Sequence, residues 1–187
     1  MALGYYQEYI RYARLGLRAE ARKSILRFVE SLSSFADKQA WTYANLLTVD
    51  RNGASSVRHE IYDLIAFPVL LDGYKRRDPE CCFLMGMSYQ NLLNYMGRLD
   101  GIEFVSRVEL LKTAYFAVPT SQKYRQALLE ALLQDFTYCD HEWPSGILGY
   151  SYPFENLKQE VKLAKKLDEE RLFCDRLAEF SERIEQS

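Results

Sequence analysis

The sequence predicts one all-α domain over residues 1–187, with seven to eight antiparallel helices packed around a central buried helix, as a helical bundle or a short α-solenoid. Apolar residues recur three or four positions apart along most of the chain, a spacing that places them on one face of a helix. Only 5 residues are proline and 9 are glycine, so few positions interrupt a helix. No run alternates apolar and polar residues, so nothing in the pattern predicts strands.

Residues 5–36 carry the first helical pattern, which is either one long helix or two helices broken near Gly16. Its inward face is a series of apolar residues: Tyr6, Ile10, Ala13, Leu17, Ala21, Ile25, Phe28, Leu32 and Phe35. The opposite side carries four arginines: Arg11, Arg14, Arg18 and Arg22. In one continuous helix they would form a stripe along about three turns. The stripe is either a solvated face or a docking strip for an acidic partner or a phosphate backbone.

Two further helices are expected over residues 37–49 and 57–71. Asp37 can cap the first, because its carboxylate can accept a hydrogen bond from an N–H of the first turn. The second has Leu64 on its apolar face and Pro68 inside the pattern. Proline lacks an N–H and crowds the preceding turn, so we expect a kink or an early end there.

The central helix is expected over residues 78–96. Asp78 is a favourable N-cap, Pro79 is tolerated in the first turn, and Glu80 complements the positive end of the helix dipole. Apolar residues then cover nearly the whole circumference: Cys81, Cys82, Phe83, Leu84, Met85, Met87, Tyr89, Leu92, Leu93, Tyr95 and Met96. A helix tolerates such a surface only when it has neighbours on several sides.

The remaining helices follow the same logic. Residues 104–118 form a helix that Pro119 ends, and it should fold back antiparallel on the central helix. A broad apolar side predicts a buried helix over residues 121–139, and residues 154–186 return to the helical pattern. Between these, residues 140–153 have no helical periodicity.

One hairpin resembles a known repeat. Met85-Gly86-x-x-Tyr89, followed by a second helix that ends at Pro119, is similar to the tetratricopeptide hairpin, whose first helix carries Leu-Gly-x-x-Tyr. The resemblance covers one hairpin, and no 34-residue period recurs in the chain. It implies stacked antiparallel hairpins and a tendency toward protein binding, and it assigns no functional residue.

The best candidate for chemistry is the run Cys139, Asp140, His141 and Glu142. It lacks the ligand spacing of a metal site, and its thiol and imidazole are too close in sequence to face each other as a catalytic pair. Phosphate-binding loops, nucleophile elbows and zinc-protease motifs are absent from the sequence. We therefore predict no catalytic residue, no metal and no cofactor.

Residues 140–153 are more suggestive as a binding loop, because long loops in helical domains are often functional. The candidate contacts are Asp140, His141, Glu142, Trp143, Tyr150 and Tyr152. Tryptophan and tyrosine are enriched at the centres of interfaces, and the two acids would suit a basic partner. Alternatively, the aromatic residues fill the core between helices.

Composition narrows the function classes. The formal net charge is −2, which argues against nucleic acid as a partner, and no apolar run is long enough to span a bilayer. The four cysteines show no paired spacing, so we expect a reducing, cytoplasmic setting. The sequence indicates a non-enzymatic protein-binding domain, either a small cytoplasmic inhibitor of the immunity-protein type or an adaptor. The alternative is an all-α enzyme or small-ligand binder with a pocket near the central helix and the 140–153 loop.

Overall fold

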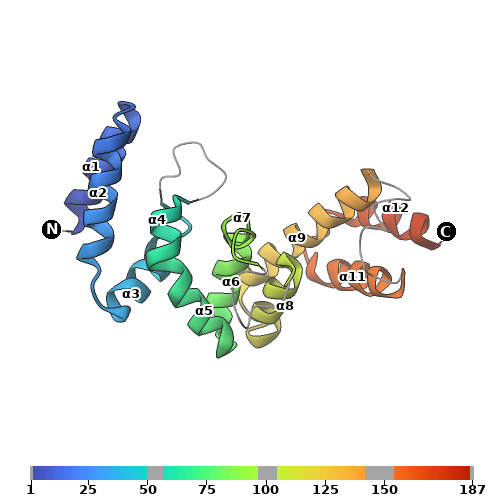
Figure 1. Cartoon of the computed structure of the whole chain (residues 1–187). Helices are drawn as coiled ribbons and strands as arrows, with labels where there is room; N and C mark the ends of the chain where they lie inside the picture. Colours follow the sequence, from blue (N-terminus) through green and yellow to red (C-terminus); the bar gives the residue numbers. More distant parts are fainter. Residues whose placement is uncertain (1, 50–56, 97–104, 142–153, 186–187) are drawn as a thin grey trace. The chain divides into compact units, whose positions relative to one another are not determined.

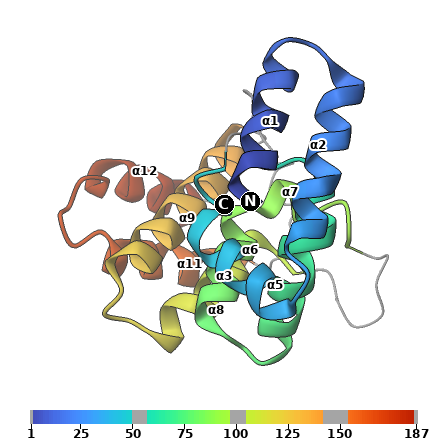
Figure 2. The same cartoon turned by 90° about the vertical axis from the view of Figure 1, so that its left-hand side faces the viewer.

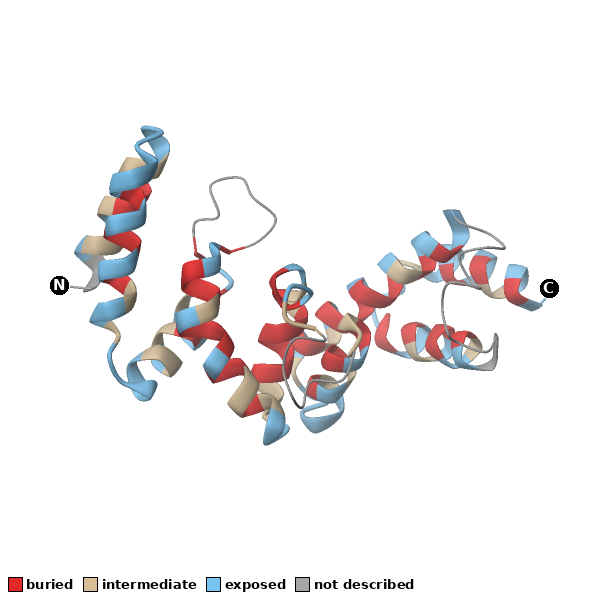
Figure 3. Ribbon diagram, viewed as in Figure 1, coloured by how far each residue is buried: buried red, intermediate tan, exposed pale blue. Residues whose placement is uncertain are grey.

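The computed structural model describes residues 2–49, 57–96, 105–141 and 154–185, and these residues are all-helical, without strands. They form two compact units, Met1–Ala114 and Tyr115–Ser187. Whether the units make the single domain expected from the sequence stays a prediction. Figure 1 shows the helices along the chain, and Figure 3 shows that buried residues gather on the helix faces that meet within each unit.

The first unit opens with a helical hairpin. Helices α1 (Ala2–Arg14) and α2 (Arg18–Ser31) lie side by side in both views (Figures 1 and 2). The ring centroids of Tyr6 and Phe28 are 5.3 Å apart, and the Ser24 hydroxyl donates a hydrogen bond to Glu8 over 3.4 Å. These pairs show that the two helices run antiparallel.

The chain reverses at Gly16, whose φ of 73° lies in the left-handed region that glycine adopts without steric cost. Of the two possibilities left by the sequence, two helices are therefore correct. The continuous arginine stripe is wrong, because Arg11 and Arg14 lie on α1 whereas Arg18 and Arg22 lie on α2.

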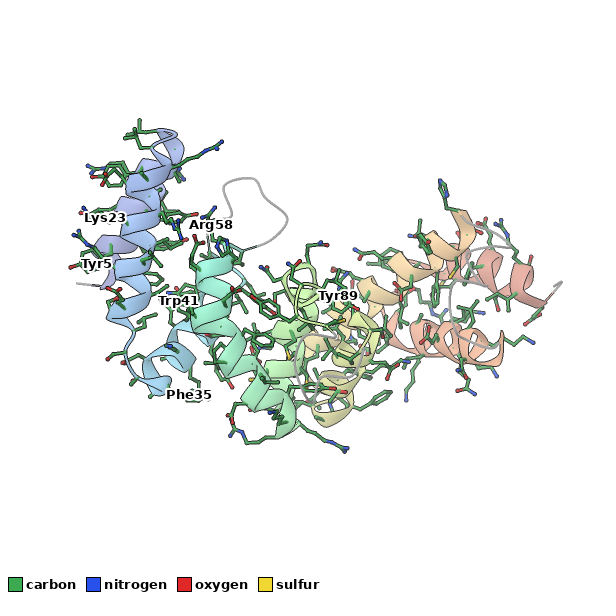
Figure 4. All side chains as sticks on the ribbon, in the orientation of Figure 1. Tyr5, Lys23, Phe35, Trp41, Arg58 and Tyr89 are labelled. Carbon is green, nitrogen blue, oxygen red and sulfur yellow. The ribbon has the colours of Figure 1, made fainter. Side chains whose placement is uncertain are left out.

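Helix α3 (Phe35–Asn45) begins earlier than predicted, because its N-cap is Ser34, three residues before the predicted cap Asp37. The Ser34 hydroxyl accepts a hydrogen bond from the Asp37 N–H over 3.0 Å, and the Asp37 carboxylate accepts one from the Ser34 N–H over 3.3 Å. This reciprocal pair is a capping box. Trp41, labelled in Figure 4, then fixes α3 to the hairpin. Its ring makes an edge-on contact with Phe28, with 5.7 Å between the ring centroids.

Pro68 neither ends nor interrupts its helix. Three segments follow without a gap: α4 (His59–Ile61), the π-helical turn η1 (Tyr62–Ala66) and α5 (Phe67–Lys75). In the π-helical turn the Phe67 N–H donates a hydrogen bond to the carbonyl of Tyr62, five residues back. The wider turn absorbs the disruption of a proline, which here sits in the first turn of α5. It also places Leu64 on the exposed side, contrary to the prediction.

Helix α5 ends in a tight corner before the predicted central helix. Arg77 has a φ of 57°, its N–H bonds the carbonyl of Tyr74 over 2.9 Å, and the Asp78 N–H bonds the carbonyl of Gly73 over 2.9 Å. This pattern is a Schellman motif. A Cβ added at Gly73 would lie 2.1 Å from Sγ of Cys81, so the glycine is what allows the two helices to approach.

Helix α6 (Pro79–Met87) begins as predicted, with the Asp78 carboxylate accepting a hydrogen bond from the Cys81 N–H over 2.9 Å. All residues from Cys81 to Gly86 are buried. The predicted continuous helix over 78–96 is nevertheless wrong. Ser88 leaves helical geometry with a φ of −108°, and its hydroxyl donates to the carbonyl of Leu84 over 2.7 Å, so a short helix α7 (Tyr89–Leu92) follows separately.

Helix α8 (Arg107–Ala117) folds back on α6 as predicted. A Cβ added at Gly86 would lie 2.8 Å from the Leu111 side chain. The Tyr89 hydroxyl donates to the carbonyl of Val105 over 3.1 Å. The later residue of the first segment, Tyr89, contacts the earlier residue of the second, Val105, so the two segments run antiparallel.

The second unit contains α9 (Gln122–His141), α11 (Phe154–Leu167) and α12 (Cys174–Glu185), with α11 packed against the other two. The terminal helical pattern is divided after Leu167. There, the buried carboxylate of Asp168 accepts hydrogen bonds from the N–H groups of Leu172 and Phe173 over 2.9 and 2.8 Å. Stacking of Phe136 on Phe180, with centroids 4.9 Å apart, fixes α9 to α12.

Candidate functional site

The turn between α1 and α2, with the arginines on both sides of it, is the candidate docking surface, and we call residues 11–22 the N-terminal tip. Leu15 and Leu17 occupy the turn, and 66% and 48% of their surfaces are exposed. Leu17 was predicted to face the core, but the reversal at Gly16 turns it outward. Both views show the turn projecting beyond the neighbouring helices of its unit (Figures 1 and 2).

The tip is strongly basic. Its four arginines, Arg11, Arg14, Arg18 and Arg22, are all exposed, and Glu20 is the one carboxylate in residues 11–22. The guanidinium group of Arg11 lies over the Tyr12 ring, 4.7 Å from its centroid. The hairpin therefore collects the predicted arginines around two exposed leucines, an arrangement that a single helix would not have produced.

The structure brings Asp140 and His141 to the last turn of α9, where both are exposed. Asp140 forms an ion pair with Arg183 of α12, and Arg176 donates hydrogen bonds to Thr137 and, over 3.1 Å, to the carbonyl of Leu133. A cavity of about 140 Å³ lies between the two helices at this point. The charge of Asp140 is therefore compensated within the protein.

Cys139 is not activated for chemistry. Burial, followed by the negative charges of Asp135 and Glu160, raises the pKa of its thiol from 9.0 to about 11. A thiol with that pKa is almost entirely protonated at neutral pH, whereas the thiolate is the nucleophile. His141 lies two positions further along the helix and is exposed, while Cys139 is buried. Within the ranges that the structure describes, no three His, Cys, Asp or Glu residues gather as they would around a metal ion.

Glu142, Trp143, Tyr150 and Tyr152, the other predicted binding residues, lie outside the described residues. Of the predicted set, Arg11 and Arg14 lie in the last turn of α1, Arg18 and Arg22 lie at the start of α2, and Asp140 with His141 lie at the end of α9. Sequence reasoning missed the exposed Leu15 and Leu17, although the Leu-Gly-Leu triplet between two arginines is a readable sign of an apolar turn.

Sequence reasoning also missed a polar contact inside the first unit. The Tyr43 hydroxyl lies 3.2 Å from Sγ of Cys81. Burial raises the pKa of the tyrosine to about 12 and that of the thiol to about 11, so both groups are protonated at neutral pH. Cys82 is likewise buried, with a pKa raised to about 11 by burial. These groups contribute packing and offer no nucleophile.

Comparison of the chain with protein-family models, with curated proteins and with solved structures gave no match. No helix in the described part of the chain has both the length and the apolar content to cross a bilayer.

Proposed function

We propose that the protein is a non-enzymatic protein-binding domain whose N-terminal tip docks onto an acidic surface of a partner protein. One observation carries this proposal: Leu15 and Leu17 stand exposed at a turn surrounded by guanidinium groups. Burying a leucine side chain contributes roughly 1.5–3 kcal/mol, and arginine is enriched at the energetic centres of interfaces. An apolar point with a basic rim suits a partner that offers an apolar depression with carboxylates around it.

The charge arrangement favours an acidic protein over nucleic acid. Specific duplex binding by a protein commonly uses about 6–10 phosphate contacts, and the tip offers four arginines. They are distributed around a turn and do not follow an extended backbone. The chain as a whole carries a formal charge of −2, which would repel nucleic acid beyond the tip.

A basic partner, which the sequence also suggests, would bind through the carboxylates of Asp140 and Glu142. Arg183 already compensates the charge of Asp140, so this surface is less suited to a basic partner. We further propose that the protein acts as an inhibitor of the immunity-protein type or as an adaptor. We also propose that its antiparallel hairpins stack around α6 in the manner of tetratricopeptide repeats. The close contact of Gly86 with Leu111 supports such stacking.

Capture of partners by the full-length protein, combined with cross-linking and mass spectrometry, tests the proposal. The variant carrying Leu15→Ser and Arg18→Glu should retain a captured partner at least ~10-fold less well than the parent. Leu26→Ser with Arg27→Glu, two exposed positions further along α2, is the matched control and should capture normally. Equal capture by the tip variant, or cross-links confined to other surfaces, would contradict the proposal.

A further inference from the structure

The second unit contains a hollow whose chemistry mirrors that of the tip. It lies between the first half of α9 and the turn that joins α11 to α12, and its volume is about 260 Å³. Its apolar lining is Leu129, Leu167, Leu172 and Phe173, and 69% of the Leu172 surface is exposed. Small-molecule pockets commonly measure about 300–1,000 Å³, so this hollow better suits one or two inserted side chains.

The rim of the hollow is acidic. Four carboxylates and one guanidinium group line the hollow: Glu130, the buried Asp168, Glu169, Glu170 and Arg125. Asp168 is engaged by two backbone N–H groups, and Glu169 forms an ion pair with Arg125. Glu130 and Glu170 are exposed and form no ion pair among the described residues. These two carboxylates are available to bind a positively charged group of a partner. We call this site the acidic hollow.

We propose that the acidic hollow of one copy of the chain receives the N-terminal tip of a second copy. The tip has four guanidinium groups, one carboxylate and two exposed leucines, whereas the hollow has four carboxylates, one guanidinium group and an apolar floor that includes the exposed Leu172. Leu15 and Leu17 enter the apolar floor, while Arg18 and Arg22 approach Glu130 and Glu170. Opposite charge patterns of this kind steer association and fix its register.

The association should be weak and sensitive to salt. A turn in a hollow of this size buries far less than the roughly 1,200–2,000 Å² of a stable interface. Exposed ion pairs contribute little and are screened by salt, so added salt should dissociate the copies. Because tip and hollow are different surfaces, the contact gives either a reciprocal pair or a growing chain of copies.

The inference uses the same tip as the proposed function, but it does not depend on that function. Self-association would cover Leu15 and Leu17 and so compete with an acidic partner. Substitutions in the hollow distinguish self-association from partner binding. Glu130→Lys with Glu170→Lys should abolish self-association and leave partner capture intact. Failure of self-association would leave the proposed function standing, and failure of partner capture would leave self-association standing.

Sedimentation velocity of the full chain over a concentration series, at low and high salt, tests the inference. At low salt the parent should associate as its concentration rises. The tip variant with Arg18→Glu and Arg22→Glu and the hollow variant with Glu130→Lys and Glu170→Lys should each associate at least ~10-fold more weakly. Arg27→Glu, which changes the same charge further along α2, should associate like the parent.

Mixing the two variants gives the decisive measurement. Each carries the opposite charges at one of the two surfaces, so the tip variant and the hollow variant together should form a mixed complex that neither forms alone. Restored association in the mixture supports the inference. A parent that stays monomeric at every concentration, variants that associate like the parent, or a mixture that stays monomeric would each overturn it. Thermal melts matching the parent would show that the variants are folded.

Discussion

Asn91 and Val57 are joined by two reciprocal hydrogen bonds. The Val57 N–H donates to the side-chain oxygen of Asn91, the Asn91 amide donates to the Val57 carbonyl, and both distances are 2.8 Å. Both residues are buried. The pair fixes helix α7 to the chain just before α4, 34 residues earlier in the sequence.

Asn91→Ala should lower the free energy of unfolding by about 2–4 kcal/mol, because it leaves a buried N–H and a buried carbonyl of Val57 without partners. Chemical denaturation followed by circular dichroism measures this. Asn94→Ala, an exposed position one turn away, is the control and should stay within ~0.5 kcal/mol of the parent. A loss at Asn91 no larger than at Asn94 would show that water replaces the side chain at Val57.

Asp168→Ala should destabilise the second unit by about 2 kcal/mol, because its carboxylate holds two backbone N–H groups in the turn before α12. Asp168→Asn keeps an acceptor oxygen and should cost less. Hydrogen exchange of the amides of Leu172 and Phe173 gives the local readout. If their exchange is as slow in Asp168→Ala as in the parent, the turn is held by other contacts.

Arg77→Gly should stabilise the protein by roughly 0.5–1 kcal/mol, since a left-handed residue at the end of a helix favours glycine. The Arg77 side chain is exposed, so its removal loses little packing. Arg76→Gly is the matched control: Arg76 has an ordinary φ of −88° and pairs with Asp72 over 2.6 Å, so this change should destabilise. A lower melting temperature for Arg77→Gly than for the parent would contradict the argument.

Stability should fall as the pH rises from about 9 toward 11. Burial raises the pKa values of Cys81, Cys82 and Cys139 to about 11 in the folded state, whereas unfolded thiols release their protons near 9. Between these values the unfolded state binds fewer protons, and each thiol removes up to ~1.4 kcal/mol of stability per pH unit. Below pH 8 these three buried thiols are protonated in both states, so they should add no pH dependence.

Denaturation at pH 8, 9 and 10 measures this effect. Cys82→Ala should flatten the decline relative to the parent, although it lowers stability at every pH through lost packing. Cys174→Ala is the control, because it removes an exposed thiol in place of a buried one. Identical slopes in Cys82→Ala and Cys174→Ala would show that the buried thiol is not responsible.

Features of the fold that depend on local sequence patterns are predicted well. The helix start at Asp78-Pro79 and the return of α8 onto α6 are confirmed, because capping and apolar spacing act within a few residues. The missed features depend on distant contacts. The apolar residues around Ser88 predict an unbroken helix, but the Ser88 hydroxyl donates a hydrogen bond to the Leu84 carbonyl and the helix ends there. Asn91 forms its hydrogen bonds with Val57, 34 residues away in the sequence.

The candidate site was predictable as a set of residues and not as a geometry. Four arginines at spacings of three and four indicate one helix face, and only the reversal at Gly16 decides that they surround a turn. Apolar periodicity alone predicts that Leu17 faces the core. The spacing of three or four residues continues across Gly16, so it does not reveal that the chain reverses there. Glycine between two leucines was the available sign.

The close approach at Gly73 limits how the first unit can vary and move. A Cβ there would also lie 2.5 Å from Cβ of Cys81, so shortening the cysteine to alanine would not make room for a larger residue at position 73. The α5–α6 corner can therefore accommodate change only by a shift of backbone, against the Schellman turn and the Asp78 cap that hold it. The α5–α6 corner is therefore rigid, and bending of this unit should be sought at Gly16 and Ser88.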